Sequence, residues 1–279
     1  MIPFDFEYYV PETVEEAVEL FAGLEEAGKE PLYYSGGTEI ITFCRQQIIK
    51  PGALVDLKAI PESCLLEKEG DKLVLGANLS LDKISEQVDY PLLAEAARAV
   101  ADKTVRNRLT LGGNICGRLP YREAILPLLL ADAEAMLAGP EGRRTEPLRT
   151  VFDKRLKLAK GEMLVRLTVP RAELDLKSWS RRRVKHGPVD YPLCHLAGVK
   201  KEGYLALAVS GLCAFAFRSD EVEKVINDTA LAPQDRAGKT VEVLPGPVRN
   251  DGRSSADYRQ ALWQKDLTEM LEEMEGAGR

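Results

Sequence analysis

The apolar and polar positions of this chain alternate between helical and extended spacing, which predicts a protein that mixes helices and strands. In residues 11–24, apolar side chains recur at helical spacing, and Thr13 with Glu16 forms a capping box at the start of the helix. Short apolar runs of strand length follow at 31–34 and 53–57. A glycine-containing turn and a short helical stretch separate these two runs, so the beginning of the chain reads as a small β–turn–α–β unit.

Helical and extended spacing also alternate along the rest of the chain. Helices are expected near 91–102, 121–133, 220–228 and 254–274, and strands near 72–75, 134–139 and 162–170. The helix at 121–133 contains Pro127, where we expect a kink. Three short antiparallel strands are expected within 193–219, and their first hairpin turn should lie at Lys200–Gly203.

The length of 279 residues suggests two domains. After Pro170 the pattern changes to a polar, basic stretch, which indicates a domain boundary. We therefore predict an α+β protein with domains at 1–172 and 173–279. The first of these should divide into subdomains at about 1–58 and 59–172.

Charge and cysteine usage exclude several function classes. A formal net charge of −6 argues against nucleic-acid and anionic-membrane partners, and no apolar window is long enough to span a bilayer. The N-terminus lacks a signal-peptide pattern, and five cysteines without a CxxC motif are typical of reduced thiols. We therefore expect a cytoplasmic protein whose own chain holds no iron–sulfur cluster or other metal site.

No catalytic constellation stands out. Cys194 and His195 are adjacent in a predicted strand, so their side chains should face opposite sides of the sheet and should not act together. We find no Ser/His/Asp set and no pair of carboxylates placed for acid–base work, and we predict no catalytic residue. Cys116 fits a small buried apolar residue better than a redox thiol.

Two double-glycine stretches carry the candidate chemistry. "SGGTEI" at 35–40 joins a strand to a helix, and glycines there would expose main-chain N–H groups that bind an anion. "TLGGN" at 110–114 repeats the pattern of a hydroxyl followed by two glycines. Neither stretch is a Walker A loop or a GxGxxG fingerprint. Brought together by folding, the two turns could hold one diphosphate from two sides.

These stretches and their flanks resemble a known family. "YYSGGTEIITFCRQQIIKPGALVDLKAI", the later "VRNRLTLGGNICGRLPYREAILPLLLADA" and the C-terminal "DGRSSADYRQAL" are similar to the FAD-binding (medium) subunit of the molybdenum hydroxylases. That family includes the xanthine dehydrogenases and the flavoproteins of the aerobic carbon monoxide dehydrogenase type. The resemblance covers nearly the whole chain.

The resemblance implies a fold and a function. The fold is the two-subdomain FAD-binding fold of the vanillyl-alcohol oxidase type, followed by a C-terminal domain with a three-stranded antiparallel sheet and helices. The function is that of an oxidoreductase subunit that transfers electrons through FAD. Electrons would come from a small subunit with two two-iron, two-sulfur clusters, beside a molybdopterin-binding large subunit, and would pass to NAD⁺ or another acceptor.

The resemblance also assigns the cofactor contacts. In the two turns these are Tyr33, Tyr34, Ser35, Gly36, Gly37, Thr38, Glu39 and Ile40, together with Thr110, Leu111, Gly112, Gly113 and Asn114. Elsewhere the implied contacts are Val100 near the flavin or adenine, Leu164 lining the isoalloxazine, Glu123 on ribose hydroxyls, and Arg181, in a loop, near the flavin. We expect the Glu39 side chain to point into solvent, away from the anion.

One departure from the family pattern leaves alternatives open. The family often has Ser-Pro-x-x-Asp where this chain has Leu119-Pro120-Tyr121-Arg122-Glu123, so a hydroxyl is lost and the acid is longer. A scaffold subunit without flavin would agree with that change. A free-standing flavin reductase of the same fold is the other alternative, although no proton donor for such a reaction can be named.

Overall fold

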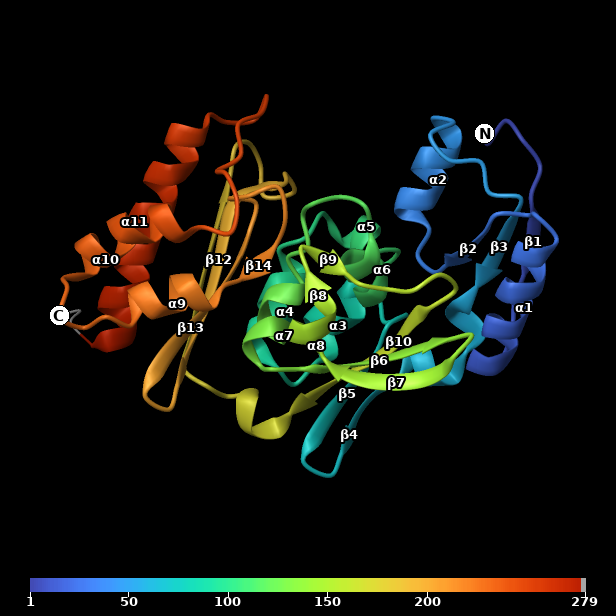
Figure 1. Cartoon of the computed structure of the whole chain (residues 1–279), viewed down its shortest axis with the longest axis horizontal. Helices are drawn as coiled ribbons and strands as arrows, with labels where there is room; N and C mark the ends of the chain where they lie inside the picture. The colour runs from blue at the N-terminus through green and yellow to red at the C-terminus, as the bar shows by residue number, and fades with distance from the viewer. Residues whose placement is uncertain (277–279) are drawn as a thin grey trace. The chain divides into compact units, whose positions relative to one another are not determined.

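The computed structural model describes residues 1–276 (Figure 1). Contacts between its residues divide the chain into two compact units, which we call the N-terminal unit and the C-terminal unit. The N-terminal unit comprises Met1–Glu86, Lys103–Arg118 and Asp132–Arg171, and the C-terminal unit comprises Gln87–Asp102, Leu119–Ala131 and Ala172–Arg279. The chain passes for the last time from the N-terminal to the C-terminal unit between Arg171 and Ala172, one residue from the predicted boundary. However, the earlier segments Gln87–Asp102 and Leu119–Ala131 also belong to the C-terminal unit. The units are therefore not contiguous stretches of sequence.

The N-terminal unit begins with a parallel three-stranded sheet in the order β1-β3-β2. Its elements are β1 (Glu7–Tyr9), α1 (Val14–Glu26), β2 (Pro31–Tyr34), α2 (Thr38–Arg45) and β3 (Ala53–Asp56). The Thr13 hydroxyl accepts a hydrogen bond from the Glu16 N–H at 3.1 Å, which confirms the predicted helix start. The apolar face of α1 packs on β3 through Val14, Ala17 and Phe21.

A second sheet completes this unit, with five antiparallel strands in the order β4-β5-β10-β6-β7. Its strands are β4 (Leu66–Glu69), β5 (Lys72–Gly76), β6 (Glu134–Gly139), β7 (Gly142–Pro147) and β10 (Met163–Pro170). The smaller elements are α3 (Leu81–Gln87), α5 (Lys103–Arg106), α6 (Leu111–Cys116), α8 (Leu148–Val151), β8 (Phe152–Asp153) and β9 (Arg155–Leu156). Pro140 and Glu141 form the turn between β6 and β7.

The C-terminal unit is built on an antiparallel sheet in the order β11-β12-β13-β14. Its strands are β11 (Ser178–Val184), β12 (Pro192–Lys201), β13 (Tyr204–Ser210) and β14 (Phe217–Arg218). Three of them are the expected strands, and β11 adds a fourth. The predicted first hairpin turn is confirmed, with Gly203 at a φ of +81°.

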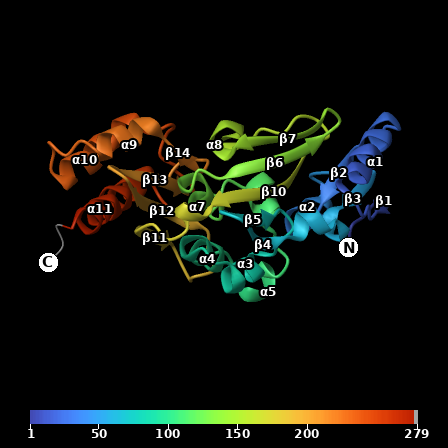
Figure 2. The same cartoon turned by 90° about the horizontal axis from the view of Figure 1, so that it is seen from below.

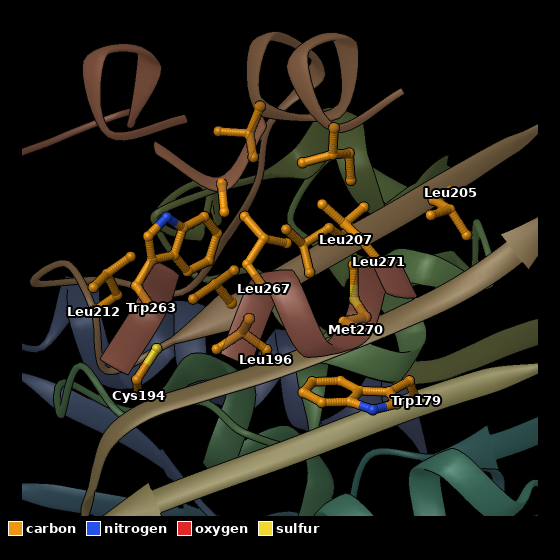
Figure 3. Close-up of a cluster of buried hydrophobic side chains, with 14 of the residues drawn as sticks. Trp179, Cys194, Leu196, Leu205, Leu207, Leu212, Trp263, Leu267, Met270 and Leu271 are labelled. Carbon is orange, nitrogen blue, oxygen red and sulfur yellow. The ribbon is translucent and has the colours of Figure 1, made fainter. Parts of the chain in front are cut away.

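Helices cover both faces of this sheet. They are α4 (Pro91–Arg98), α7 (Ile125–Leu130), α9 (Asp220–Ile226), α10 (Pro233–Lys239) and α11 (Ala256–Glu275). Both views place α9, α10 and α11 together on one face (Figures 1 and 2). Trp263, Leu267 and Met270 of α11 pack there against Trp179 and Leu196 of the sheet (Figure 3).

The predicted kinked helix is wrong. The segment at 121–133 forms only a short helix that begins at Ile125, so Pro127 lies in the first turn. A first-turn residue has no intrahelical acceptor for its N–H, so proline is tolerated there and causes no kink.

Candidate functional site

The first glycine turn presents main-chain N–H groups. Strand β2 ends at Tyr34 and helix α2 begins at Thr38, with Gly37 between them at a φ of +71°. Among the described residues, no side chain caps the start of α2. Within residues 1–276, the N–H groups of Gly36, Gly37 and Thr38 donate to no protein acceptor. Three N–H groups at the positive end of a helix make a site for an anion.

Folding brings the second glycine stretch against the first. The Ser35 Oγ lies 2.5 Å from Asn78 Oδ1 and 3.2 Å from Thr110 Oγ1. A Cβ on Gly36 would lie 1.8 Å from the carbonyl oxygen of Arg108. Gly36 is therefore required by the close approach of the two chain segments themselves.

The second stretch does not offer main-chain N–H groups, which corrects the prediction that both turns do. Residues Leu111–Cys116 form helix α6, capped by the hydroxyl of Thr110. The four N–H groups at the start of α6 all have protein acceptors. These are Leu111 N to Leu79 O at 2.9 Å, Gly112 N to Ala77 O at 2.7 Å, Gly113 N to Thr110 Oγ1 at 3.1 Å and Asn114 N to Thr110 O at 2.8 Å.

The two glycines of α6 have different surroundings. A Cβ on Gly112 would lie 2.9 Å from the Cβ of Ala77, so packing requires that glycine. Gly113 is exposed, and a Cβ there would meet only Thr110 Oγ1, at 2.9 Å. Glycine inside a helix costs about 1 kcal/mol relative to alanine. The open surface at Gly113 therefore fits close approach by a ligand, and together with the start of α2 it fits a diphosphate.

Tyr33 and Tyr34 are held within the N-terminal unit. The Tyr33 ring stacks on Phe21 with the ring centres 4.3 Å apart, and its hydroxyl donates to the Gly161 carbonyl at 2.9 Å. The Tyr34 ring lies edge-on to Tyr8. Their side chains thus stabilise the strand that leads into the first turn.

Glu39 does not point into solvent, contrary to our expectation. Its Oε1 accepts a hydrogen bond from the main-chain N–H of Arg118 at 2.7 Å, just after the end of α6. The carboxylate therefore ties α2 to the segment after α6. Ile40 is partly exposed on α2, and Leu164 is buried on β10 opposite Leu137.

The remaining predicted contacts belong to the C-terminal unit and stay predictions. Val100 follows α4 and is partly exposed. Arg181 lies in strand β11 and not in a loop, with its guanidinium 5.3 Å from the centre of the Trp179 ring and 3.4 Å from Glu269. Glu123 is buried, at 2% exposure.

Both oxygens of the Glu123 carboxylate have partners inside the C-terminal unit. Oε2 accepts from Arg182 Nε at 2.6 Å and lies 2.8 Å from His195 Nδ1, and Oε1 accepts from Arg182 Nη2 at 3.1 Å. Arg182 also donates to the carbonyl oxygens of Pro188 and Asp190. This network holds the segment that precedes α7 against β11 and β12.

Ser180 extends this network into an arrangement that the sequence did not reveal. Its Oγ lies 3.1 Å from His195 Nε2, so Ser180, His195 and Glu123 follow the order of a catalytic triad. However, the His195 ring is 1% exposed and Arg182 shares the same carboxylate oxygen. We therefore assign these three residues a structural role and not a catalytic one. Cys194 faces the opposite side of the sheet, as predicted.

The network makes stability depend on pH. Burial would raise the pKa of the Glu123 carboxyl, but hydrogen bonds and charges from His195 and Arg182 outweigh it and lower the pKa below its ordinary value of 4.5. A lowered folded-state pKa gives stability that is present above pH 4.5 and is lost as the pH falls through the folded-state value.

We expect the difference in unfolding free energy between wild type and Glu123→Gln to shrink as the pH falls below 4.5. Urea unfolding of both proteins at a series of pH values measures this difference. A difference that grows in acid would contradict the assignment.

Sequence reasoning missed three residues beside the first turn. Asn78 Nδ2 donates to the Leu57 carbonyl at 2.6 Å and to Ser63 Oγ at 2.6 Å, which fixes the amide that meets Ser35. Asp56 and Lys58 follow at the carboxyl end of β3. Asp56 and Lys58 could have been found from the sequence, because they stand at the end of a predicted buried strand and ligands often bind at the carboxyl ends of parallel strands. Cys116 is exposed and is therefore not the core residue that we expected.

Comparisons with known proteins identify the family of this chain. A family described as "FAD binding domain in molybdopterin dehydrogenase" matches residues 4–172. The carbon monoxide dehydrogenase medium chain of Hydrogenophaga pseudoflava is 30% identical over 274 residues, covering 94% of both chains. The glyceraldehyde dehydrogenase medium chain of Sulfolobus acidocaldarius is 27% identical, covering 94% of this chain and 95% of its own.

A solved structure of carbon monoxide dehydrogenase from Hydrogenophaga pseudoflava matches 96% of both chains with a TM-score of 0.83 and 29% identity. No helix among residues 1–276 is long and apolar enough to cross a membrane. The family match covers more than half of the chain, and the first relative is alike over nearly its full length. This chain therefore belongs to the FAD-binding domain family of the molybdopterin dehydrogenases, and its cofactor is FAD.

Proposed function

We propose that this protein is the electron-transfer subunit of a molybdenum hydroxylase complex. It takes electrons from iron–sulfur clusters of a small partner subunit and passes them to NAD⁺ or another acceptor, while a molybdopterin-binding large subunit oxidises the substrate. The relatives named as medium chains of dehydrogenases support this assignment. Bound FAD would supply the electron-carrying chemistry, and the chain supplies binding and orientation.

One observation carries the proposal. Three main-chain N–H groups, from Gly36, Gly37 and Thr38, have no acceptor in the described part of the chain and lie at the uncapped start of α2. A dianionic diphosphate is a ligand that such groups and the helix dipole favour. Gly113 is exposed on α6 and has no Cβ, so the same ligand can also come close to the main chain of α6.

Thr38→Asp tests this site without disturbing the fold. An acidic residue at the first position of a helix is favourable for the helix, but its charge repels a diphosphate placed there. We expect FAD affinity to fall about 100-fold, which corresponds to roughly 3 kcal/mol for like charges about 4–5 Å apart near a surface. Titration of the apoprotein with FAD, followed by flavin fluorescence, measures the change.

Thr42→Asp is the matched control, because Thr42 is exposed one turn further along the same helix. It adds the same charge away from the start of α2 and should leave affinity within about threefold of wild type. Equal affinity of Thr38→Asp and Thr42→Asp would place the diphosphate elsewhere. Wild-type protein that fails to bind FAD would refute the proposed function itself.

A further inference from the structure

We propose that Lys58 is a positioning residue for the diphosphate site, acting through the peptide group between Ser35 and Gly36. This inference rests on the proposed function, since it concerns how the same site is held ready. Lys58 does not have to touch the cofactor. Its ammonium group fixes the direction in which the N–H of Gly36 points.

The Lys58 ammonium group has three neighbours in the N-terminal unit. Its Nζ donates to the carbonyl oxygen of Ser35 at 3.1 Å and to the two carboxylate oxygens of Asp56 at 2.7 and 2.6 Å. It also lies 4.5 Å from the centre of the Tyr34 ring. The ammonium group therefore links the carboxyl end of β3 to the residues that leave β2.

Asp56 is a rigid anchor for this contact. It is 4% exposed, and it accepts hydrogen bonds from the Tyr8 hydroxyl and, at 3.1 Å, from the main-chain N–H of Lys58. Burial and the hydrogen bond to Asp56 raise the pKa of the Tyr8 hydroxyl. The Tyr8 hydroxyl therefore stays protonated and keeps donating to Asp56. These hydrogen bonds fix the Asp56 carboxylate, which in turn fixes the position of the Lys58 ammonium group.

The geometry of a trans peptide transmits this constraint. The C=O and N–H of one peptide group point in opposite directions. Because Lys58 holds the Ser35 carbonyl, the N–H of Gly36 points away from Lys58. That N–H has no protein acceptor among residues 1–276, and the Arg108 carbonyl packs against the position where a Cβ of Gly36 would stand. The peptide group is thus fixed with its donor open to a ligand.

Charge compensation distinguishes positioning from direct phosphate binding. The Lys58 charge is paired with the buried Asp56 carboxylate at 2.6 Å, so the pair as a whole is neutral. A neutral pair that orients a peptide should have an effect that salt does not screen. A lysine that touches phosphate directly should lose its effect at high ionic strength.

Lys58→Met combined with Asp56→Asn removes the ammonium group together with its counter-charge, so the net charge beside the first turn stays unchanged, and it keeps an unbranched chain over Tyr34. We expect it to weaken binding of both FAD and ADP about tenfold, in low and in high salt, since one charge-oriented hydrogen-bond donor is lost from the site. ADP is the second probe because it carries the diphosphate without the flavin. Calorimetric titration well below the unfolding midpoint of each variant measures both affinities.

Two control variants make the outcome decisive. Lys58→Arg keeps a donor and should restore affinity to within about threefold of wild type. Lys72→Met combined with Glu134→Gln removes an ion pair whose lysine has the same 46% side-chain exposure, and it should leave both affinities unchanged. If the Lys58→Met/Asp56→Asn protein bound like the Lys72→Met/Glu134→Gln protein, the inference would be overturned, as it would by a loss confined to low salt. Wild type that binds neither FAD nor ADP would instead refute the proposed function.

Discussion

Glu123→Gln is expected to lower the free energy of unfolding by about 3–5 kcal/mol, because it leaves a largely buried guanidinium without its anion. Arg182 is 13% exposed in its side chain and Glu123 is 3% exposed, so little water can reach the position of the lost partner. His195 loses its charged neighbour in the same step. The resemblance assigned Glu123 to a ribose, whereas its contacts within the chain predict a stability defect that appears without any cofactor.

The two tryptophans give a selective measurement. Trp179 and Trp263 are the only tryptophans of the chain, and both lie in the core of the C-terminal unit, which contains Glu123 (Figure 3). Urea unfolding of the apoprotein followed by tryptophan fluorescence therefore reports on that unit. Glu134→Gln breaks an exposed pair with Lys72 and should cost no more than about 1 kcal/mol. A stable Glu123→Gln protein with weakened FAD binding would favour the ribose contact.

The strongly patterned elements could be predicted from sequence, because local physics fixes them. The helix that starts after Thr13 has both an apolar face and a capping box, and the structure has it. Strand β11 was missed because its "SRRR" stretch looks like a solvated loop. In the fold each arginine has a partner, such as Glu123 for Arg182 and Asp266 for Arg183. These partners are distant from the arginines in the sequence, so a local pattern of residues does not predict the ion pairs.

The glycine turns show the same limit within the candidate site. Sequence indicated two turns of equal role, and the fold gives them different roles. Leu111 and Gly112 use their N–H groups on the carbonyls of Leu79 and Ala77, since the loop after β5 lies beside α6. In the part of the chain that the structure describes, no carbonyl accepts from the N–H groups of the first turn. Tertiary contacts decide which N–H groups remain without an acceptor. The composition of a turn alone cannot predict those contacts.

Gly36→Ala should have the largest effect on cofactor binding, reducing FAD affinity by at least about 100-fold. Its Cβ would lie 1.8 Å from the Arg108 carbonyl oxygen and 2.9 Å from its carbon, which are main-chain atoms. The two segments must therefore separate by more than about 1 Å, a displacement that costs on the order of 100-fold where groups must be placed accurately. Separation would also break the contact between Ser35 and Thr110. Flavin fluorescence titration of the apoprotein measures the loss.

Two other glycines separate this effect from the general effect of adding a methyl group. Gly23 lies in α1 with nothing within 4 Å of a Cβ, so Gly23→Ala should bind FAD normally and gain about 1 kcal/mol of stability. Gly113→Ala adds a Cβ at the exposed surface of α6, where it meets the Thr110 hydroxyl at 2.9 Å and no main-chain atom, so it should weaken FAD binding while far-ultraviolet circular dichroism stays that of wild type. If Gly36→Ala bound FAD as well as Gly23→Ala, the contact between the two segments would have no part in holding the cofactor. If Gly113→Ala did so, the open surface of α6 would not be where the ligand approaches, and only the start of α2 would remain as its anion site.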